Sequence, residues 1–140
     1  MQVTSFEEMQ AIAQGEVVEF AGFVTGKPFK CRVRRISIED FIMGDNVPNR
    51  LMDRVGEIFD TAIAIDEGEI KKPTKKQLKD VEDLEDSILK VVMIEPKFEE
   101  VEKAGLKLSS AQRAQLLDYG FGEVNKYSDF RSEQENTEID

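Results

Sequence analysis

The sequence predicts a mainly α domain with a small N-terminal β-hairpin, which is an α+β fold. Residues 37–121 carry apolar side chains at helical spacing, divided by glycine and proline into separate segments. Residues 29–34 instead alternate apolar and basic side chains, the period of a strand. A length of 140 residues suits one domain. We therefore expect a compact helical domain of about five to six helices.

The first expected element is a short helix that begins after Ser5. Ser5 and Glu8 have the spacing of a capping box, in which each side chain bonds the other's backbone N–H. Gly15 is placed to end this helix. Its apolar residues share one face: Phe6, Met9, Ile12 and Ala13.

A β-hairpin is expected over about residues 17–35. The turn 25–28, with sequence TGKP, joins a strand near residues 17–24 to the alternating strand 29–34. Phe29, Cys31 and Val33 share one face of the second strand, and this face should pack on helices, because an isolated hairpin is marginal in water. We expect Cys31 to be a small buried apolar residue.

The hairpin also carries a basic stripe in an otherwise acidic chain. Residues 24–36 contain five bases and no acid, although the whole chain has a net charge of -10. The stripe has three interpretations: a solvated or internally paired face, a contact for an acidic partner, or a nucleic-acid contact, which the net charge disfavours. Its members are Lys27, Lys30, Arg32, Arg34 and Arg35.

From Ser37 onward the expected elements are helices. Ser37 should cap a short helix that stops at Gly44, and Pro48 suits the first turn of one continuous helix through Ile63. The apolar stripe of that helix has two interpretations, core packing or a groove for a partner helix. Its members are Leu51, Met52, Val55, Ile58, Phe59, Ala62 and Ile63.

Three more helices are expected after a polar connector at 66–73, which is the best candidate for a mobile loop. Capping boxes at Thr74 and Ser109 begin two of them, and a short helix over 98–104 lies between. Pro96 ends the first of these helices. Apolar residues between 124 and 130 could add one last turn or two, and 132–140 reads as a disordered acidic tail, which leaves 1–131 as a single domain.

Composition excludes several functional classes. Without histidine the chain has no Ser-His or Cys-His nucleophile and no imidazole metal ligand. One cysteine forms no internal disulfide, and the longest apolar run, 20–24, is far shorter than the ~20 residues that span a bilayer. Since the N-terminus also lacks a signal-peptide pattern, we expect a soluble, cytosolic protein that does not bind membranes.

The sequence shows no active site or cofactor motif. Neighbouring carboxylates such as Glu7/Glu8 and those of 99–102 fall on expected solvated faces, and acidic pairs arise by chance in a chain with 29 acids. The loop 66–77 lacks calcium-ligand spacing, and the glycines at 26 and 120–122 lack phosphate-loop spacing. We therefore expect a protein that is not an enzyme and holds no cofactor or metal.

Three segments, in order, resemble the tail assembly chaperones of bacteriophages with long non-contractile tails that infect Gram-positive hosts. Residues 31–51 (CRVRRISIEDFIMGDNVPNRL) resemble a family strand end, short helix and G-x-I-P-N-x-L turn, with a longer Gly-to-Pro stretch here. An amphipathic helix follows in the family and ends near a pair such as Ile58-Phe59. Residues 92–101 (VMIEPKFEEV) resemble its E-P-x-[FY]-E-E-[IV] segment, and 108–112 (LSSAQ) resemble the start of its last helix.

The resemblance, which covers roughly residues 17–131, implies a non-enzymatic role in tail morphogenesis. Such chaperones bind the hydrophobic, helical tape-measure protein, keep it soluble, recruit tail-tube subunits and leave the finished tail. The implied protein acts in the host cytoplasm, is not retained in the mature virion, and could form a homo-oligomer. The residues to which we assign partner binding are Lys30, Arg32, Arg34, Arg35, Pro48, Asn49, Leu51, Met52, Val55, Ile58 and Phe59.

Other functions remain as alternatives. One is a different phage structural component, such as a head–tail joining or tail-completion protein. Another is a nucleic-acid-facing regulator that uses the basic hairpin, although the net charge of -10 favours no nucleic-acid partner. A hydrolase with paired carboxylates is the remotest alternative.

Overall fold

The computed structural model describes residues 1–44 and 46–122 of the chain. In this part the fold is α+β, as predicted: a three-stranded antiparallel sheet with strand order β1-β2-β3, and seven helices. The predicted turns at 124–130 and the predicted tail at 132–140 lie outside the described residues. The elements are α1 (Phe6–Ala13), β1 (Glu16–Val24), β2 (Lys27–Val33), α2 (Ile38–Met43), α3 (Asn49–Met52), α4 (Val55–Asp66), α5 (Lys75–Val92), β3 (Met93–Glu95), α6 (Phe98–Lys103) and α7 (Ser110–Gly120).

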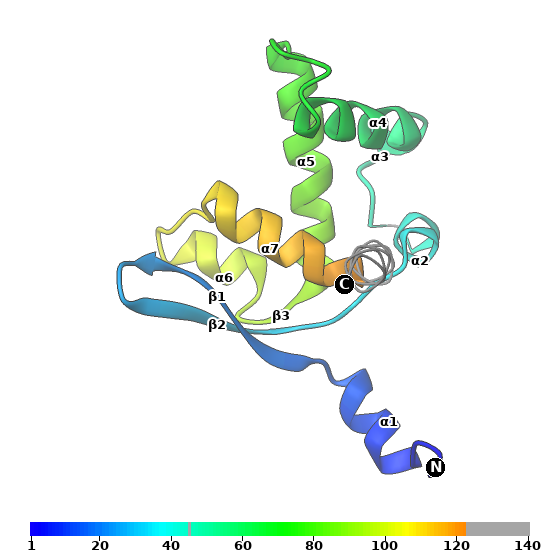
Figure 1. Cartoon of the computed structure of the whole chain (residues 1–140). Coiled ribbons are helices and arrows are strands. Elements are labelled where there is room, and N and C mark those ends of the chain that lie inside the picture. Colours follow the sequence, from blue (N-terminus) through cyan, green and yellow to red (C-terminus); the bar gives the residue numbers. More distant parts are fainter. Residues whose placement is uncertain (45, 123–140) are drawn as a thin grey trace, which may run out of the picture.

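The long helix α5 is the axis of the body. Figure 1 shows α4 against one half of α5, and α6, α7 and the sheet around the other half. Its buried face includes Leu84, Ile88 and Val92, which join side chains from the sheet, α2, α4 and α7 in one core. The capping box predicted at Thr74 is present, because Thr74 Oγ1 accepts from Gln77 N–H and Gln77 Oε1 accepts from Thr74 N–H.

The hairpin forms as expected and packs its apolar face inward. β1 and β2 pair antiparallel from Glu16↔Val33 to Phe20↔Phe29, and a bulge precedes Val24↔Lys27. Cys31 and Val33 are fully buried. Burial also raises the pKa of Cys31 to about 11, against the lowering effect of a backbone hydrogen bond from Glu95. Cys31 is therefore a buried apolar residue, as predicted, and its thiol stays protonated at neutral pH.

The prediction of one helix from Pro48 to Ile63 is wrong. The chain forms α3 and α4 with a break at Asp53 and Arg54, where Arg54 has φ -122° and ψ 10°. Gly56 beside the break has low helix propensity, so the local cost of interrupting the helix is small. Contacts of this segment with α5 outweigh that cost, and the seventh helix in the described residues comes from this division.

The strand β3 was not predicted. Residues 93–95 leave α5 and pair with β2 through Val33↔Met93 and Arg32↔Glu95, with a shift of register between the two pairs. The apolar run 91–94 suits a helix or a strand equally, so periodicity does not distinguish them. The deciding factor is the open edge of β2, which supplies hydrogen-bond partners from about sixty positions earlier in the chain.

The remaining helices match the expectations. α2 begins at Ser37, whose Oγ accepts from Asp40 N–H, and α7 begins at the capping box of Ser109 and Gln112. α1 begins at Ser5, whose Oγ accepts from Glu8 N–H. This is one half of the predicted capping box, and the described residues do not form the reciprocal bond from Ser5 N–H to the Glu8 side chain. The mobility expected for the connector 66–73 stays a prediction. None of the helices within 1–44 and 46–122 combines the length and apolar character needed to cross a bilayer.

Candidate protein-binding surface

The predicted apolar stripe lies mainly in the core, except at its end, where Ile63 is 53% exposed. Leu51, Val55 and Ile58 are buried, which confirms the core-packing interpretation for these three side chains. Met52 and Phe59 are half-buried, and the Phe59 ring meets Phe121 edge-on with 6.3 Å between ring centroids. This stripe therefore attaches α3 and α4 to the body.

Pro48 and Asn49 lie at the start of α3. Pro48 occupies the N-cap position and is half-buried, and Asn49 is exposed. Just before them, α2 presents Met43, which is 83% exposed, and the more shielded Ile38. The segment from α2 to α3 thus exposes apolar and amide groups beside a proline turn.

Three of the five side chains of the basic stripe contact other groups of the chain. Arg32 Nη1 donates to Gly15 O at 3.3 Å, and the Arg35 guanidinium lies 4.9 Å from the centroid of the Tyr119 ring. Lys30 and Glu19 approach at 4.0 Å across the hairpin, an exposed pair of small energetic value. These contacts support the internally paired interpretation for much of the stripe.

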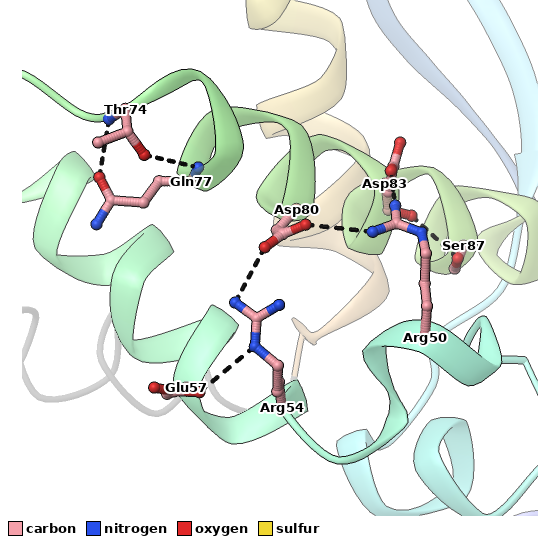
Figure 2. A network of polar contacts seen from close by, with 8 residues as sticks. All are labelled: Arg50, Arg54, Glu57, Thr74, Gln77, Asp80, Asp83 and Ser87. Carbon is pink, nitrogen blue, oxygen red and sulfur yellow. Dashed lines mark hydrogen bonds and ion pairs between the residues drawn. The ribbon is translucent and has the colours of Figure 1, made fainter.

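An ionic cluster that the sequence analysis missed joins α3 and α4 to α5 (Figure 2). Arg50 Nη1 and Arg54 Nη2 donate to the two oxygens of buried Asp80 at 3.3 and 3.0 Å, and Arg50 also pairs with Asp83. Burial alone would raise the pKa of Asp80, but the hydrogen bonds and charges of the two arginines outweigh it and lower the pKa. The only signal in the sequence was the spacing of Arg50 and Arg54, which are four residues apart.

A second missed group attaches α7 to the sheet. Gln112 Nε2 donates to Ala21 O at 2.8 Å, and Ala21 N–H donates to Gln115 Oε1 at 2.7 Å. Ala21 lies at the bulge of β1, where the ladder with β2 is interrupted. The two glutamines therefore replace missing strand hydrogen bonds.

A third missed group joins α7 to α5. Arg113 Nη2 donates to Glu85 Oε1 at 3.3 Å, and Arg113 Nη1 forms an ion pair with Asp86 Oδ1 at 2.8 Å. Burial raises the pKa of Glu85 and outweighs the opposite effect of Arg113. These contacts are structural connections between helices.

The helix α1 carries the most exposed apolar face in the described chain. It has no buried residue, and Phe6, Met9 and Ile12 are 69%, 51% and 71% exposed. In Figure 1 it projects from the end of the sheet, away from the other helices. The sequence predicted this amphipathic face but not that the body leaves it uncovered.

A cleft of about 540 Å³ lies where α1 meets the body. Ala11 and Ile12 form its helical wall, and Arg34, Arg35 and Tyr119 lie on the body side. Tyr119 Oη donates to Glu16, and partial burial together with this bond raises the pKa of Tyr119 against the effect of Arg35. The cleft therefore combines an apolar wall with two cationic side chains and one carboxylate, that of Glu16.

The described residues contain no group of three or more Cys, Asp or Glu side chains placed to hold a metal ion. Comparison of the chain with models of protein families, with curated proteins and with solved structures finds no match.

Proposed function

We propose that the protein is a non-enzymatic phage tail assembly chaperone that binds the tape-measure protein and recruits tail-tube subunits. The observation that carries the proposal is the ordered set of three motif segments over residues 31–51, 92–101 and 108–112. Each motif segment covers a boundary between secondary-structure elements. The first runs from β2 to α3, the second includes β3 and reaches α6, and the third includes the start of α7. The set therefore coincides with the framework of the fold.

The segment from α2 to α3 supplies the client-binding surface in this proposal, the client being the tape-measure protein. It contains the longest motif, and it exposes Met43 and Ile38 next to Asn49. Glu39 and Asp40 lie exposed in the first turn of α2. An apolar surface bordered by acids suits an apolar helix bordered by basic residues.

Co-expression with the tape-measure protein of the same phage tests the function. We expect the client to become soluble and to elute with the chain as one complex in gel filtration. Separate elution of two soluble proteins, or a client that stays insoluble, would contradict the proposal. The protein acts in the host cytoplasm in this scheme, so mass spectrometry should find it absent from purified virions, whereas a head–tail joining or tail-completion protein would be present.

A pair of variants tests the surface. Met43→Glu places a charge on the proposed client face and should reduce the solubilised client severalfold, because burial of an unpaired carboxylate against an apolar helix is unfavourable. Ile12→Glu on α1 is the matched control, since Ile12 is similarly exposed, and it should leave the yield unchanged. Equal yields of soluble client from both variants would show that the client binds another surface of the protein. The proposed function would be unaffected.

A further inference from the structure

The apolar face of α1 has a fixed position although the body does not cover it. Gly15 follows the helix with φ +82°, and a Cβ there would lie 2.4 Å from Val33 O and 2.7 Å from Ile94 Cδ1. Arg32 also donates to Gly15 O. Since β2 and β3 hold the connection between α1 and β1 this closely, α1 is presented as a defined surface.

The charges around α1 are arranged unevenly along its length. Glu7 and Glu8 lie in the first turn, and the helix itself carries no base. Arg34 and Arg35 line the same cleft as Ile12 of the last turn, together with one carboxylate, Glu16. One end of this surface therefore carries two acids, and the other carries two arginines against one acid, with exposed apolar side chains between the two ends.

We infer that a second copy of the chain covers this surface, by antiparallel packing of two α1 helices around a two-fold axis. A two-fold contact brings one patch onto the same patch, so the patch must be complementary to itself when reversed. The α1 surface meets this condition, because reversal places the acidic first turn of each copy at the basic cleft of the other. This inference does not depend on the proposed function.

The dimensions of the helix fit this arrangement. An eight-residue helix is about 12 Å long, so helices that cross near Met9 overlap along their whole length. At 100° per residue, Glu8 borders the apolar face on the side of Ala11 and Ile12, which is also the side of the cleft. A two-fold axis perpendicular to both helices leaves the cleft side of each α1 on the same side of the helix pair. Glu8 of each copy therefore faces Arg34 of the other copy.

Complementary charge distinguishes a second copy from an unrelated apolar partner. Each dimer would form two symmetry-related Glu8–Arg34 contacts and would bury Phe6, Met9 and Ile12 of both copies. The contact is small and the two bodies are acidic, so we expect a weak, reversible dimer.

Sedimentation equilibrium of the full chain measures this association. Over roughly 1–300 µM, a range suited to a small interface, the weight-average mass should rise from 15.9 kDa towards twice that value. Ile12→Glu should keep the mass at that of the monomer. Met43→Glu, an equally polar change at an exposed site on α2, should leave the dimer intact.

A charge exchange tests the predicted orientation. Glu8→Lys and Arg34→Glu should each weaken self-association about tenfold, because two symmetry-related pairs change from attraction to repulsion. An equimolar mixture of the two variants should regain dimerisation, since both contacts in the mixed dimer pair opposite charges. Arg35 is left unchanged because it stacks on Tyr119.

Three results would overturn the inference. The wild-type chain is monomeric at all concentrations, or Ile12→Glu still dimerises. In the third, the equimolar mixture of Glu8→Lys and Arg34→Glu associates no more strongly than either variant alone. Circular dichroism of each variant checks folding, and no loss is expected because the substituted side chains are exposed. The experiment contains no client, so its failure is distinct from a failure of the proposed chaperone function.

Discussion

At the scale of single residues, two buried polar side chains connect elements that are distant in the sequence. Asp80 receives hydrogen bonds from Arg50 and Arg54, and so holds α3 and the start of α4 against α5. Gln112 is buried and bonds Ala21 O, which satisfies a carbonyl at the bulge of β1. A buried polar group costs stability unless it is paired, so each of these contacts is specific to this arrangement of elements.

Asp80 should make stability depend on pH in the acid range. Its pKa in the folded chain lies below the ordinary value of 3.8, so it stabilises the fold at pH values above 3.8, and this contribution is lost as pH falls through the folded pKa. Asp80→Asn should lower the urea midpoint of unfolding at neutral pH. The difference in midpoint between the variant and wild type should become smaller below pH 3.8. Urea unfolding followed by circular dichroism at several pH values measures this.

The matched control is Asp60→Asn, which changes an exposed carboxylate on α4 and should leave the midpoint close to that of wild type. Glu85, whose pKa is raised, acts in the opposite sense, and comparison with wild type at each pH removes its contribution. If the difference in urea midpoint between Asp80→Asn and wild type stays constant down to the lowest pH measured, the stabilising role assigned to ionised Asp80 is contradicted.

At the scale of elements, the bulge in the hairpin depends on a glycine. A Cβ on Gly22 would lie 1.7 Å from Lys27 O, so no other residue fits without movement of the backbone. The bulge also displaces Ala21 from the ladder and makes its backbone groups accessible to the glutamines of α7. One glycine therefore determines how the sheet meets α7.

Gly22→Ala should destabilise the protein by at least about 2 kcal/mol, because the backbone of the hairpin must shift. Gly56→Ala is the matched control: a Cβ there meets nothing within 4 Å, and alanine in α4 should stabilise by about 0.5–1 kcal/mol. Free energies of unfolding from urea titration compare the two variants. A Gly22→Ala protein as stable as wild type would show that the bulge is not required.

At the scale of the whole molecule, α1 and the body make unequal contributions to stability. The core unites side chains from the sheet and from every helix from α2 to α7, whereas α1 adds none. The exposed apolar face of α1 is therefore not part of the core, and removal of α1 should have little effect on the body.

Deletion of residues 2–12 should change the free energy of unfolding by no more than about 0.5 kcal/mol, as is usual for changes away from buried groups. Leu51→Ala, in contrast, should cost about 2–5 kcal/mol, since Leu51 is fully buried in the core. Urea titration at low protein concentration makes the comparison on the monomer. Similar losses for both variants would show that α1 contributes to the stability of the body.

Much of the fold follows from local patterns in the sequence. Capping residues indicate the N-termini of three helices, at Ser37, Thr74 and Ser109. The alternation of apolar and basic residues indicates the hairpin. The candidate site is less well predicted, because Leu51 and Ile12 belong to equally good amphipathic patterns. Leu51 is buried and Ile12 is exposed, and periodicity alone carries no information on which apolar face another element covers.

The sequence by itself determined the α+β class and the place of most helices and of both hairpin strands, because capping, turn and periodicity signals act within a few residues. Only the tertiary structure decided the break between α3 and α4, the strand β3 and the pairing of Asp80 with two arginines. It also left α1 uncovered next to Arg34 and Arg35. These features depend on contacts between segments tens of residues apart, and such contacts outweigh local preferences of about 1 kcal/mol per residue.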